Sequence, residues 1–205
     1  MAIQLSPVQI DVLQELINIG VGRAAALLNR MIATHIKLYV PELRILSPED
    51  LQALYLEQSQ TPFAAVRLSF SGKFTGTSAL VFPPDSASKL VSVIIGEDSL
   101  SLDMDSIRIG TLQEVGNIVL NGVMGSIGNV LNEHIIYSPL DYFEGQFSSL
   151  VQFDQDETST VLLARARFDV EQLSIGGDII ILFHLGTFDV LLQSMDKLTA
   201  AAMRA

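Results

Sequence analysis

The 205-residue sequence has no cysteine, only 3 histidines and no long apolar run. Without cysteine the chain has no disulfide, no thiolate zinc site and no cysteine nucleophile. The histidines stand at positions 35, 134 and 184 and show neither the HxH nor the HExxH spacing of a metal-dependent hydrolase. No apolar stretch approaches the ~18 residues of a membrane span. These absences argue against disulfide-stapled, metallohydrolase and membrane-spanning proteins.

Basic residues are also scarce. The chain has 12 Lys and Arg against 23 Asp and Glu, a formal net charge of -11. Nucleic-acid binding needs clustered basic side chains for phosphate contacts, so the charge balance argues against it. The first seven residues lack a basic segment before an apolar core, so we expect no signal peptide and a cytoplasmic location. With 49% hydrophobic residues, the chain can form one large domain or two closely packed half-domains.

The sequence does contain a repeated segment with a helical pattern. A Glu-x-x-Asn pair occurs as Glu15 and Asn18 and again, 99 residues later, as Glu114 and Asn117. The histidines at 35 and 134 are also 99 apart, and strand-like segments recur at offsets of 98 and 101. The sequence therefore predicts a single domain made of two repeats, about 1-100 and about 101-205.

Each predicted repeat has the order helix, strand, two-stranded hairpin, helix. The expected elements are a helix from Ser6-Pro7 to about Ala33, a strand over 34–40 that ends at Pro41, a short helix over 48–55, strands over 63–70 and 75–82, a helix over 83–95, a helix from 103 or 106 to Leu131, a strand over 134–137, strands near 165–168 and 177–183, and a helix over 187–203. We expect an α/β (α+β) fold with a largely antiparallel sheet, pseudo-two-fold symmetry and the two long helices on one face.

The repeated pair belongs to a narrow polar stripe. Asp11, Glu15 and Asn18 stand at i, i+4 and i+7, within roughly 60° of arc on a helix. In the second copy Asn121 extends the stripe of Glu114 and Asn117. A single Glu-x-x-Asn is an ordinary solvated feature of an amphipathic helix. Because Asn is a mediocre helix former, its repeated placement inside two apolar helices favours a functional pair.

Several glycines interrupt the same two helices, although each costs ~1 kcal/mol relative to alanine in a helix interior. They are Gly20, Gly22, Gly116, Gly122, Gly125 and Gly128. We expect them to permit close approach of one long helix to the other, the alternative being close approach of a docked partner.

The spacing Asp11-x3-Glu15-x2-Asn18-x22-Pro41 resembles the active-site signature of the CheC/CheX/FliY family of chemotaxis phosphatases. That signature is Asp or Ser, three residues, Glu, two residues, Asn, twenty-two residues and Pro, and the first copy matches at all four positions. The resemblance covers essentially the whole chain. Length and internal duplication most resemble the CheC branch of the family.

The second copy departs from the signature. Gly110 stands where the family has Asp or Ser, and Pro139 follows Asn117 after 21 residues. Glu114 and Asn117 themselves are intact. The missing acidic or hydroxyl residue indicates that the first site is active and the second site weaker.

The resemblance implies hydrolysis of the aspartyl phosphate of a CheY-type response regulator. Asn18 and Asn117 would orient the attacking water, and Glu15 and Glu114 would pair with a cationic residue of the regulator, its active-site Lys being the expected one. Asp11 and Asn121 would add partner contacts. The prolines, Pro41 and Pro139, would be structural. The protein would need no cofactor of its own, since the Mg2+ would belong to the regulator.

A non-catalytic adaptor is the alternative from another class. Family members of the CheC type also bind CheD, a receptor-modifying deamidase, and the Glu/Asn pairs would then only bind the phosphorylated regulator. A structural flagellar-switch component is a third, weaker interpretation, because the sequence shows no second domain.

Overall fold

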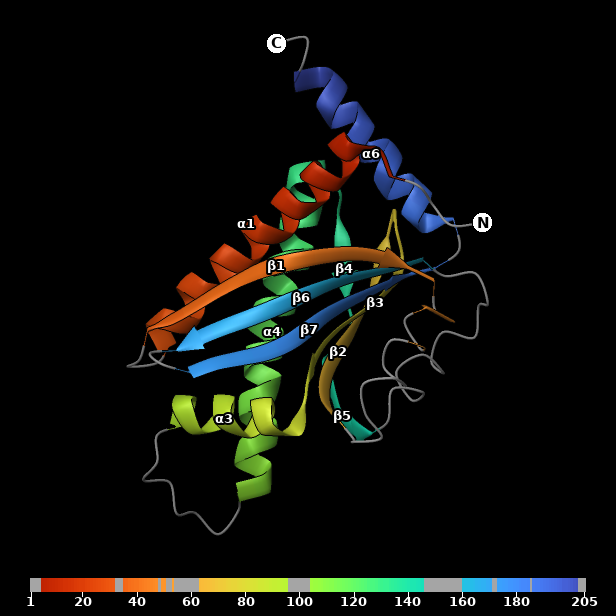
Figure 1. Cartoon of the computed structure of the whole chain (residues 1–205). Helices are drawn as coiled ribbons and strands as arrows, with labels where there is room; N and C mark the ends of the chain where they lie inside the picture. The colour runs from red at the N-terminus through yellow and green to blue at the C-terminus, as the bar shows by residue number, and fades with distance from the viewer. Residues whose placement is uncertain are drawn as a thin grey trace.

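The computed structural model describes residues 5–31, 35–47, 49–50, 53, 63–95, 104–145, 160–170, 173–184 and 186–202. Its elements are α1 (Pro7–Met31), β1 (Ile36–Leu46), β2 (Phe63–Gly72), β3 (Gly76–Phe82), α3 (Pro84–Ile95), α4 (Met104–Leu131), β4 (Ile135–Tyr137), β5 (Asp141–Gly145), β6 (Thr160–Val170), β7 (Leu173–Phe183) and α6 (Thr187–Ala202). The strands form one antiparallel sheet, and α1 and α4 lie side by side over one face (Figure 1). This architecture confirms the predicted mixed fold.

The first long helix begins where its sequence predicts. Pro7 is its first residue, and Ser6 caps it: the backbone N–H of Gln9 donates to Ser6 Oγ at 3.2 Å. The Gln9 side chain returns the contact, because its Oε1 accepts from the Ser6 backbone N–H at 3.0 Å. This reciprocal capping box satisfies two N–H groups that the helix leaves without a partner.

The sheet order is β1-β6-β7-β3-β2-β4, with β5 also paired to β2. The first strand of the chain, β1, thus pairs with β6 from the second half of the sequence. In the same way, β4 and β5 from the second half pair with β2 from the first half. The two hairpins, β2–β3 and β6–β7, meet at the centre through β3 and β7. Each half of the sequence therefore supplies the edge strand of the other.

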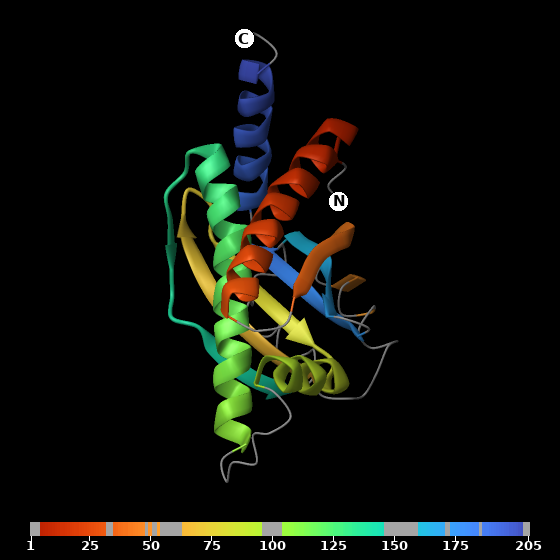
Figure 2. The same ribbon diagram turned by 90° about the vertical axis from the view of Figure 1, so that its left-hand side faces the viewer.

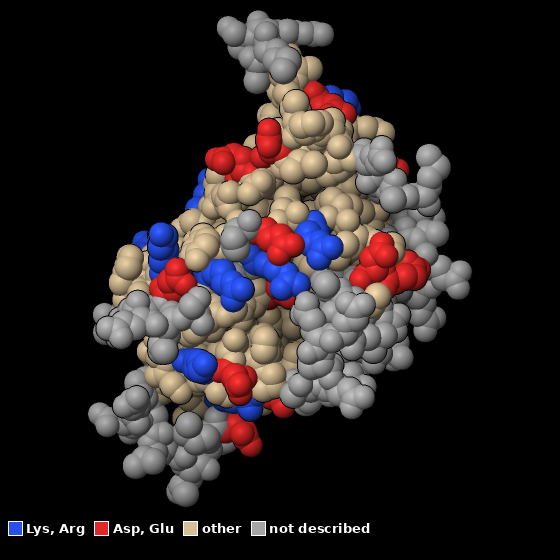
Figure 3. Space-filling view, in the orientation of Figure 1, with Lys and Arg blue, Asp and Glu red and all other residues tan. Residues whose placement is uncertain are grey.

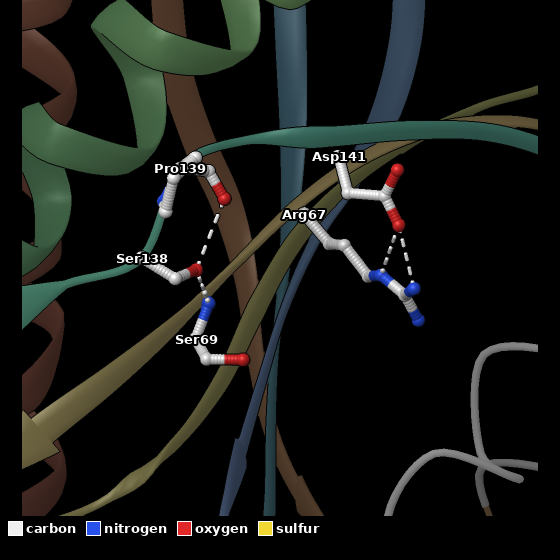
Figure 4. Close-up of polar contacts among 5 residues, drawn as sticks. All are labelled: Arg67, Ser69, Ser138, Pro139 and Asp141. Carbon is white, nitrogen blue, oxygen red and sulfur yellow. Dashed lines mark hydrogen bonds and ion pairs between the residues drawn. The ribbon is translucent and has the colours of Figure 1, made fainter.

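Matched ion pairs join these edge strands to the sheet. Glu42 on β1 lies opposite Arg165 on β6, with 3.3 Å between Oε2 and Nε. Asp141 on β5 lies opposite Arg67 on β2, with 2.6 Å between Oδ2 and Nη2 (Figure 4). The two acids are 99 positions apart and the two arginines 98. Two repeats would produce such a match; the boundary near residue 100 stays a prediction.

The long helices touch through glycine. A Cβ on Gly20 would lie 2.5 Å from the Cα of Val123 and 2.6 Å from the carbonyl oxygen of Gly122. A Cβ on Gly122 would lie 2.8 Å from the carbonyl oxygen of Gly20. Figure 2 shows the two helices running in opposite directions in front of the sheet. The close helix approach expected for these glycines is confirmed.

The glycines of α4 do not all serve this contact. A Cβ on Gly116 would lie 2.6 Å from the Cγ1 of Val66 on β2, so this glycine lets the helix approach the sheet. Gly125, by contrast, has open space where a Cβ would be, as does Gly22 on α1. The helix glycines therefore divide into close-contact positions and positions with room for a side chain.

The two faces of the sheet differ in their surroundings. The face toward the helices contributes to the large core, which includes Phe82, Phe168 and Phe183. The opposite face holds a smaller buried cluster, consisting of Phe63, Ala65, Ala79, Val81, Val161, Leu163, Ile180 and Leu182. Charged side chains of both signs gather on the surface over β1 and β6 in Figure 3. In the described part of the chain no helix is long and apolar enough to cross a membrane.

Two segments at the edges of the sheet differ from the sequence prediction, and a third predicted segment lies mostly outside the described residues. The strand predicted to end at Pro41 was wrong in extent, because β1 continues to Leu46 with a register shift between Tyr39 and Glu42. The edge strand β5 was not predicted at all. The short helix expected over 48–55 falls mostly outside the described residues, of which 49, 50 and 53 are helical.

We predict that Gly20→Ala lowers the free energy of unfolding by about 1–3 kcal/mol, because the added methyl group would overlap the backbone of α4. Gly22→Ala on the same helix is the matched control. Nothing lies within 4 Å of its Cβ, and we expect a gain of about 0.5–1 kcal/mol from helix propensity alone. Urea unfolding of both variants measures the difference. Equal stability of the two variants would contradict backbone contact at the crossing.

Candidate functional site

The polar stripe of α1 points away from the core. Asp11, Glu15 and Asn18 are all exposed, whereas Leu13 and Leu16 between them are 0% and 2% exposed. The helix is buried on the opposite side against α4 and the sheet. A carboxylate and a carboxamide therefore stand one turn apart on a rigid, solvent-facing surface.

The stripe of α4 is similar but deeper. Gly110 and Glu114 are exposed, while Asn117 and Asn121 are half-buried. The Nδ2 of Asn121 donates a hydrogen bond to the Oδ1 of Asn117 at 2.5 Å. The side chain of Asn117 is therefore already engaged within its own helix.

The two stripes differ at both ends. Shifting α1 by the 99-residue offset puts Asp11 opposite Gly110 and Gly22 opposite Asn121. Gly22 and Gly110 each have nothing within 4 Å of an added Cβ. The first stripe thus has its extra polar side chain before the Glu/Asn pair, and the second has it after the pair.

A cavity of about 360 Å³ adjoins the stripe of α4. It is lined from three helices, by Leu28 of α1, Ile94 of α3 and Ile107, Gly110, Thr111, Glu114 and Val115 of α4. Apart from Glu114 and Thr111 its lining is apolar. Sequence patterning missed this cavity because its walls come from three distant segments, and the only local signal is the glycine at position 110.

The two signature prolines do not lie on the long helices. Both are in the edge segments of the sheet. Pro41 is within β1, at the register shift, and Pro139 is between β4 and β5. Beside it, Ser138 Oγ accepts from the backbone N–H of Ser69 at 2.9 Å and donates to the Pro139 carbonyl at 3.0 Å (Figure 4). Proline has no N–H for a strand ladder, so edge irregularities suit it.

The beginning of α4 is tied to β5 by a polar cluster. Arg108 Nη2 lies 2.9 Å from Glu144 Oε1, and the Tyr142 hydroxyl donates to the same carboxylate. Burial, together with this hydrogen bond to Glu144, raises the pKa of Tyr142 well above its usual value. The phenol therefore stays a donor through the physiological pH range and helps hold the helix that carries Glu114.

The described residues offer no group of three or more His, Asp or Glu side chains that could hold a metal ion. Each stripe contains a Glu/Asn pair, a carboxylate about one turn before a carboxamide. A carboxamide can donate to one oxygen and accept from another, and a carboxylate can pair with a cation. The arrangement is suited to binding and orienting groups that a partner brings.

Comparison with known proteins places these features in context. No family model matches the chain. The CheY-P phosphatase CheC of Bacillus subtilis is 25% identical over 169 residues, covering 78% of this chain and 80% of CheC. The flagellar motor switch phosphatase FliY of the same organism is 23% identical over 137 residues, covering 66% of this chain but only 35% of FliY.

Solved structures share the fold. Thermotoga maritima FliY superposes with a TM-score of 0.75 at 16% identity, covering 96% of this chain and 100% of that one. CheX in a complex with CheY, BeF3 and Mg2+ from Borrelia burgdorferi gives a TM-score of 0.54 at 15% identity, covering 83% of this chain and 99% of that one.

We predict that Glu15→Ala and Asn18→Ala leave the fold intact. Both side chains are exposed, so their removal costs no buried contact. Asn18→Ala is expected to raise the free energy of unfolding by up to about 0.7 kcal/mol, because alanine is the better helix former. Chemical denaturation checks this; a loss above about 1 kcal/mol would assign the pair to folding.

Proposed function

We propose that this chain, which belongs to the CheC/CheX/FliY family, hydrolyses the aspartyl phosphate of a CheY-type response regulator. The observation that carries the proposal is the Glu/Asn pair on each of the two long helices, exposed on α1 and partly exposed on α4, in a chain related over most of its length to a CheY-P phosphatase. Exposure of Glu15 and Asn18 means that the fold itself makes no use of these side chains.

Hydrolysis of an aspartyl phosphate requires positioning of the reactants more than it requires reactive groups from the protein. Phosphoryl transfer passes through a loose transition state, and catalysis comes from alignment and charge stabilisation. Attack by a water oxygen on phosphorus breaks the bond between phosphorus and the aspartate carboxyl oxygen. The products are inorganic phosphate and the free carboxylate. A protein that contributes one well-placed carboxamide can accelerate such a step by holding the water in line.

The roles of the pair follow from their functional groups. Asn18 and Asn117 each carry a donor and an acceptor, which together can fix a water beside the phosphorus. Glu15 and Glu114 carry a negative charge that can pair with a lysine of the regulator and fix the docking register. We assign Mg2+ to the regulator, where it would neutralise phosphoryl charge; the B. burgdorferi complex contains CheY together with BeF3 and Mg2+.

The first site is proposed to be the stronger one. Asp11 stands one turn before Glu15 and is exposed, so it can contact the rim of a docked regulator. The second site has Gly110 at this place, which offers no side chain. The proposal keeps Pro41 and Pro139 as structural residues of the edge strands.

We predict that this protein accelerates loss of phosphate from a CheY-type regulator in the presence of Mg2+. Asn18→Ala combined with Asn117→Ala should reduce the acceleration by at least ~10-fold, because neither Glu/Asn pair keeps the carboxamide that holds the water. Asn129→Ala is the matched control: Asn129 is an exposed asparagine of α4 outside the stripe, and its removal should leave the rate unchanged. The phosphate that remains on the regulator is followed over time.

The same variants test the adaptor alternative. Binding of the BeF3-activated regulator to wild type and to the double variant is measured in parallel. A phosphatase keeps binding and loses turnover when both asparagines are removed. An adaptor for the phosphorylated regulator or CheD shows binding with no acceleration by the wild-type protein, and that result would refute the proposed activity.

A separate prediction concerns the ranking of the two sites. Asn18→Ala alone should reduce turnover more than Asn117→Ala alone, because only the first site has the acidic rim residue. Turnover numbers of the two single variants with one regulator decide this. A greater loss in Asn117→Ala would reverse the ranking.

A further inference from the structure

The two predicted sites differ in what surrounds the asparagine. On α4 the carboxamide of Asn121 lies one turn after Asn117 and bonds to it at 2.5 Å. On α1 the matching position is Gly22, with nothing within 4 Å where a side chain would start. Asn18 is exposed, while Asn117 is half-buried. Among the described residues, therefore, a side-chain partner for the carboxamide is found at the second site and not at the first.

The bond determines which end of the Asn117 carboxamide is offered to a partner. Asn121 donates through Nδ2, so Asn117 receives this bond on Oδ1. A flipped Asn117 would turn its Nδ2 toward the Asn121 donor and lose this bond, so the carboxamide keeps its Nδ2 as the group that can donate to a partner. Rotation about the terminal side-chain torsion is otherwise broad and soft. On α1, Gly22 stands at the matching position and has no side chain that could restrain Asn18 in this way.

We propose that Asn121 is a positioning residue that holds the Asn117 carboxamide in one of its two orientations and so presets the second site. This inference rests on the proposed function and changes the role expected for Asn121 from partner contact to support of Asn117. The preset orientation compensates in part for the missing acidic side chain at Gly110 of the second site. The first site has the opposite combination, an acidic rim residue in Asp11 and a glycine, Gly22, where the second site has Asn121.

A purely structural role for the bond is a poor explanation of its placement. Side-chain pairs at i and i+4 add only ~0.2–0.5 kcal/mol to a helix. The helix is already held by the Gly20–Gly122 contact and by its buried apolar residues. What the bond changes most is the freedom of the carboxamide, which matters to a group that must align a water molecule.

The test first inactivates the first site and then changes Asn121 in the second site. In an Asn18→Ala background, where only the second site works, Asn121→Gly and Asn121→Leu should lower kcat about three- to tenfold, matching the loss of one hydrogen bond. KM should stay within about twofold, since Glu114 still docks the regulator. Asn121→Gln keeps a donor at i+4 and should restore most of kcat. The leucine variant removes the donor without the helix cost of glycine.

The reverse change is made in the first site. In an Asn117→Ala background, Gly22→Asn should raise kcat about threefold, because the new carboxamide has open space and can bond to Asn18. A higher kcat for Asn121→Gly or Asn121→Leu would mean that Asn121 withholds Asn117 from water, and would overturn the proposal. A kcat that is unchanged in both of these Asn121 variants would also overturn the proposal.

A readout without any regulator keeps this inference distinct from the proposed activity. The side-chain amide of Asn117 is followed by nitrogen relaxation in the free protein. Its order parameter should fall to below about 0.6 when Asn121 is changed to Leu, and return in Asn121→Gln. An Asn117 amide that is equally ordered without Asn121 refutes the positioning role, whereas absence of phosphatase activity in the wild-type protein refutes only the proposed function.

Discussion

The contact of α1 with α4 at Gly20 and Gly122 is the constraint on which the rest of this molecule depends. Two backbones can meet there only because neither residue has a Cβ. The meeting brings two long helices onto one face of the sheet, each with its apolar side inward. The outward side of each helix is then the side left for polar residues. The Glu/Asn pairs occupy that side, so the packing that stabilises the fold also determines which residues a partner can reach.

Much of this arrangement could be predicted from the sequence, because it is written in local patterns. Ser6-Pro7 and the apolar period of α1 predict that helix closely, and the alternation in 63–82 predicts the central hairpin. The face of α1 that carries Glu15 and Asn18 follows from helical geometry alone. These features need no knowledge of distant contacts, and the structure agrees with each of them.

The features that the sequence could not predict depend on partners far along the chain. Pro41 was expected to end a strand, but β1 passes through it as an edge strand whose outer side needs no N–H donor. Strand β5 has too little alternation to be recognised and is held by pairing with β2. The cavity beside Glu114 and the bond from Asn121 to Asn117 involve side chains whose orientations a pattern does not encode. The roles of the site residues themselves stay predictions from the family signature.

The exchange of edge strands has a consequence for how the chain folds during synthesis. When the first hundred residues have left the ribosome, β2 and β3 can form a hairpin, but β1 must wait for β6, made more than a hundred residues later. Such long-range pairing slows folding and leaves an apolar strand exposed in the meantime. A fragment cut near residue 100 would leave β1 without its neighbour, so gene truncation near this point should give an aggregating product and not a half-sized working unit. The sheet can therefore be completed only after both halves of the chain have been synthesised.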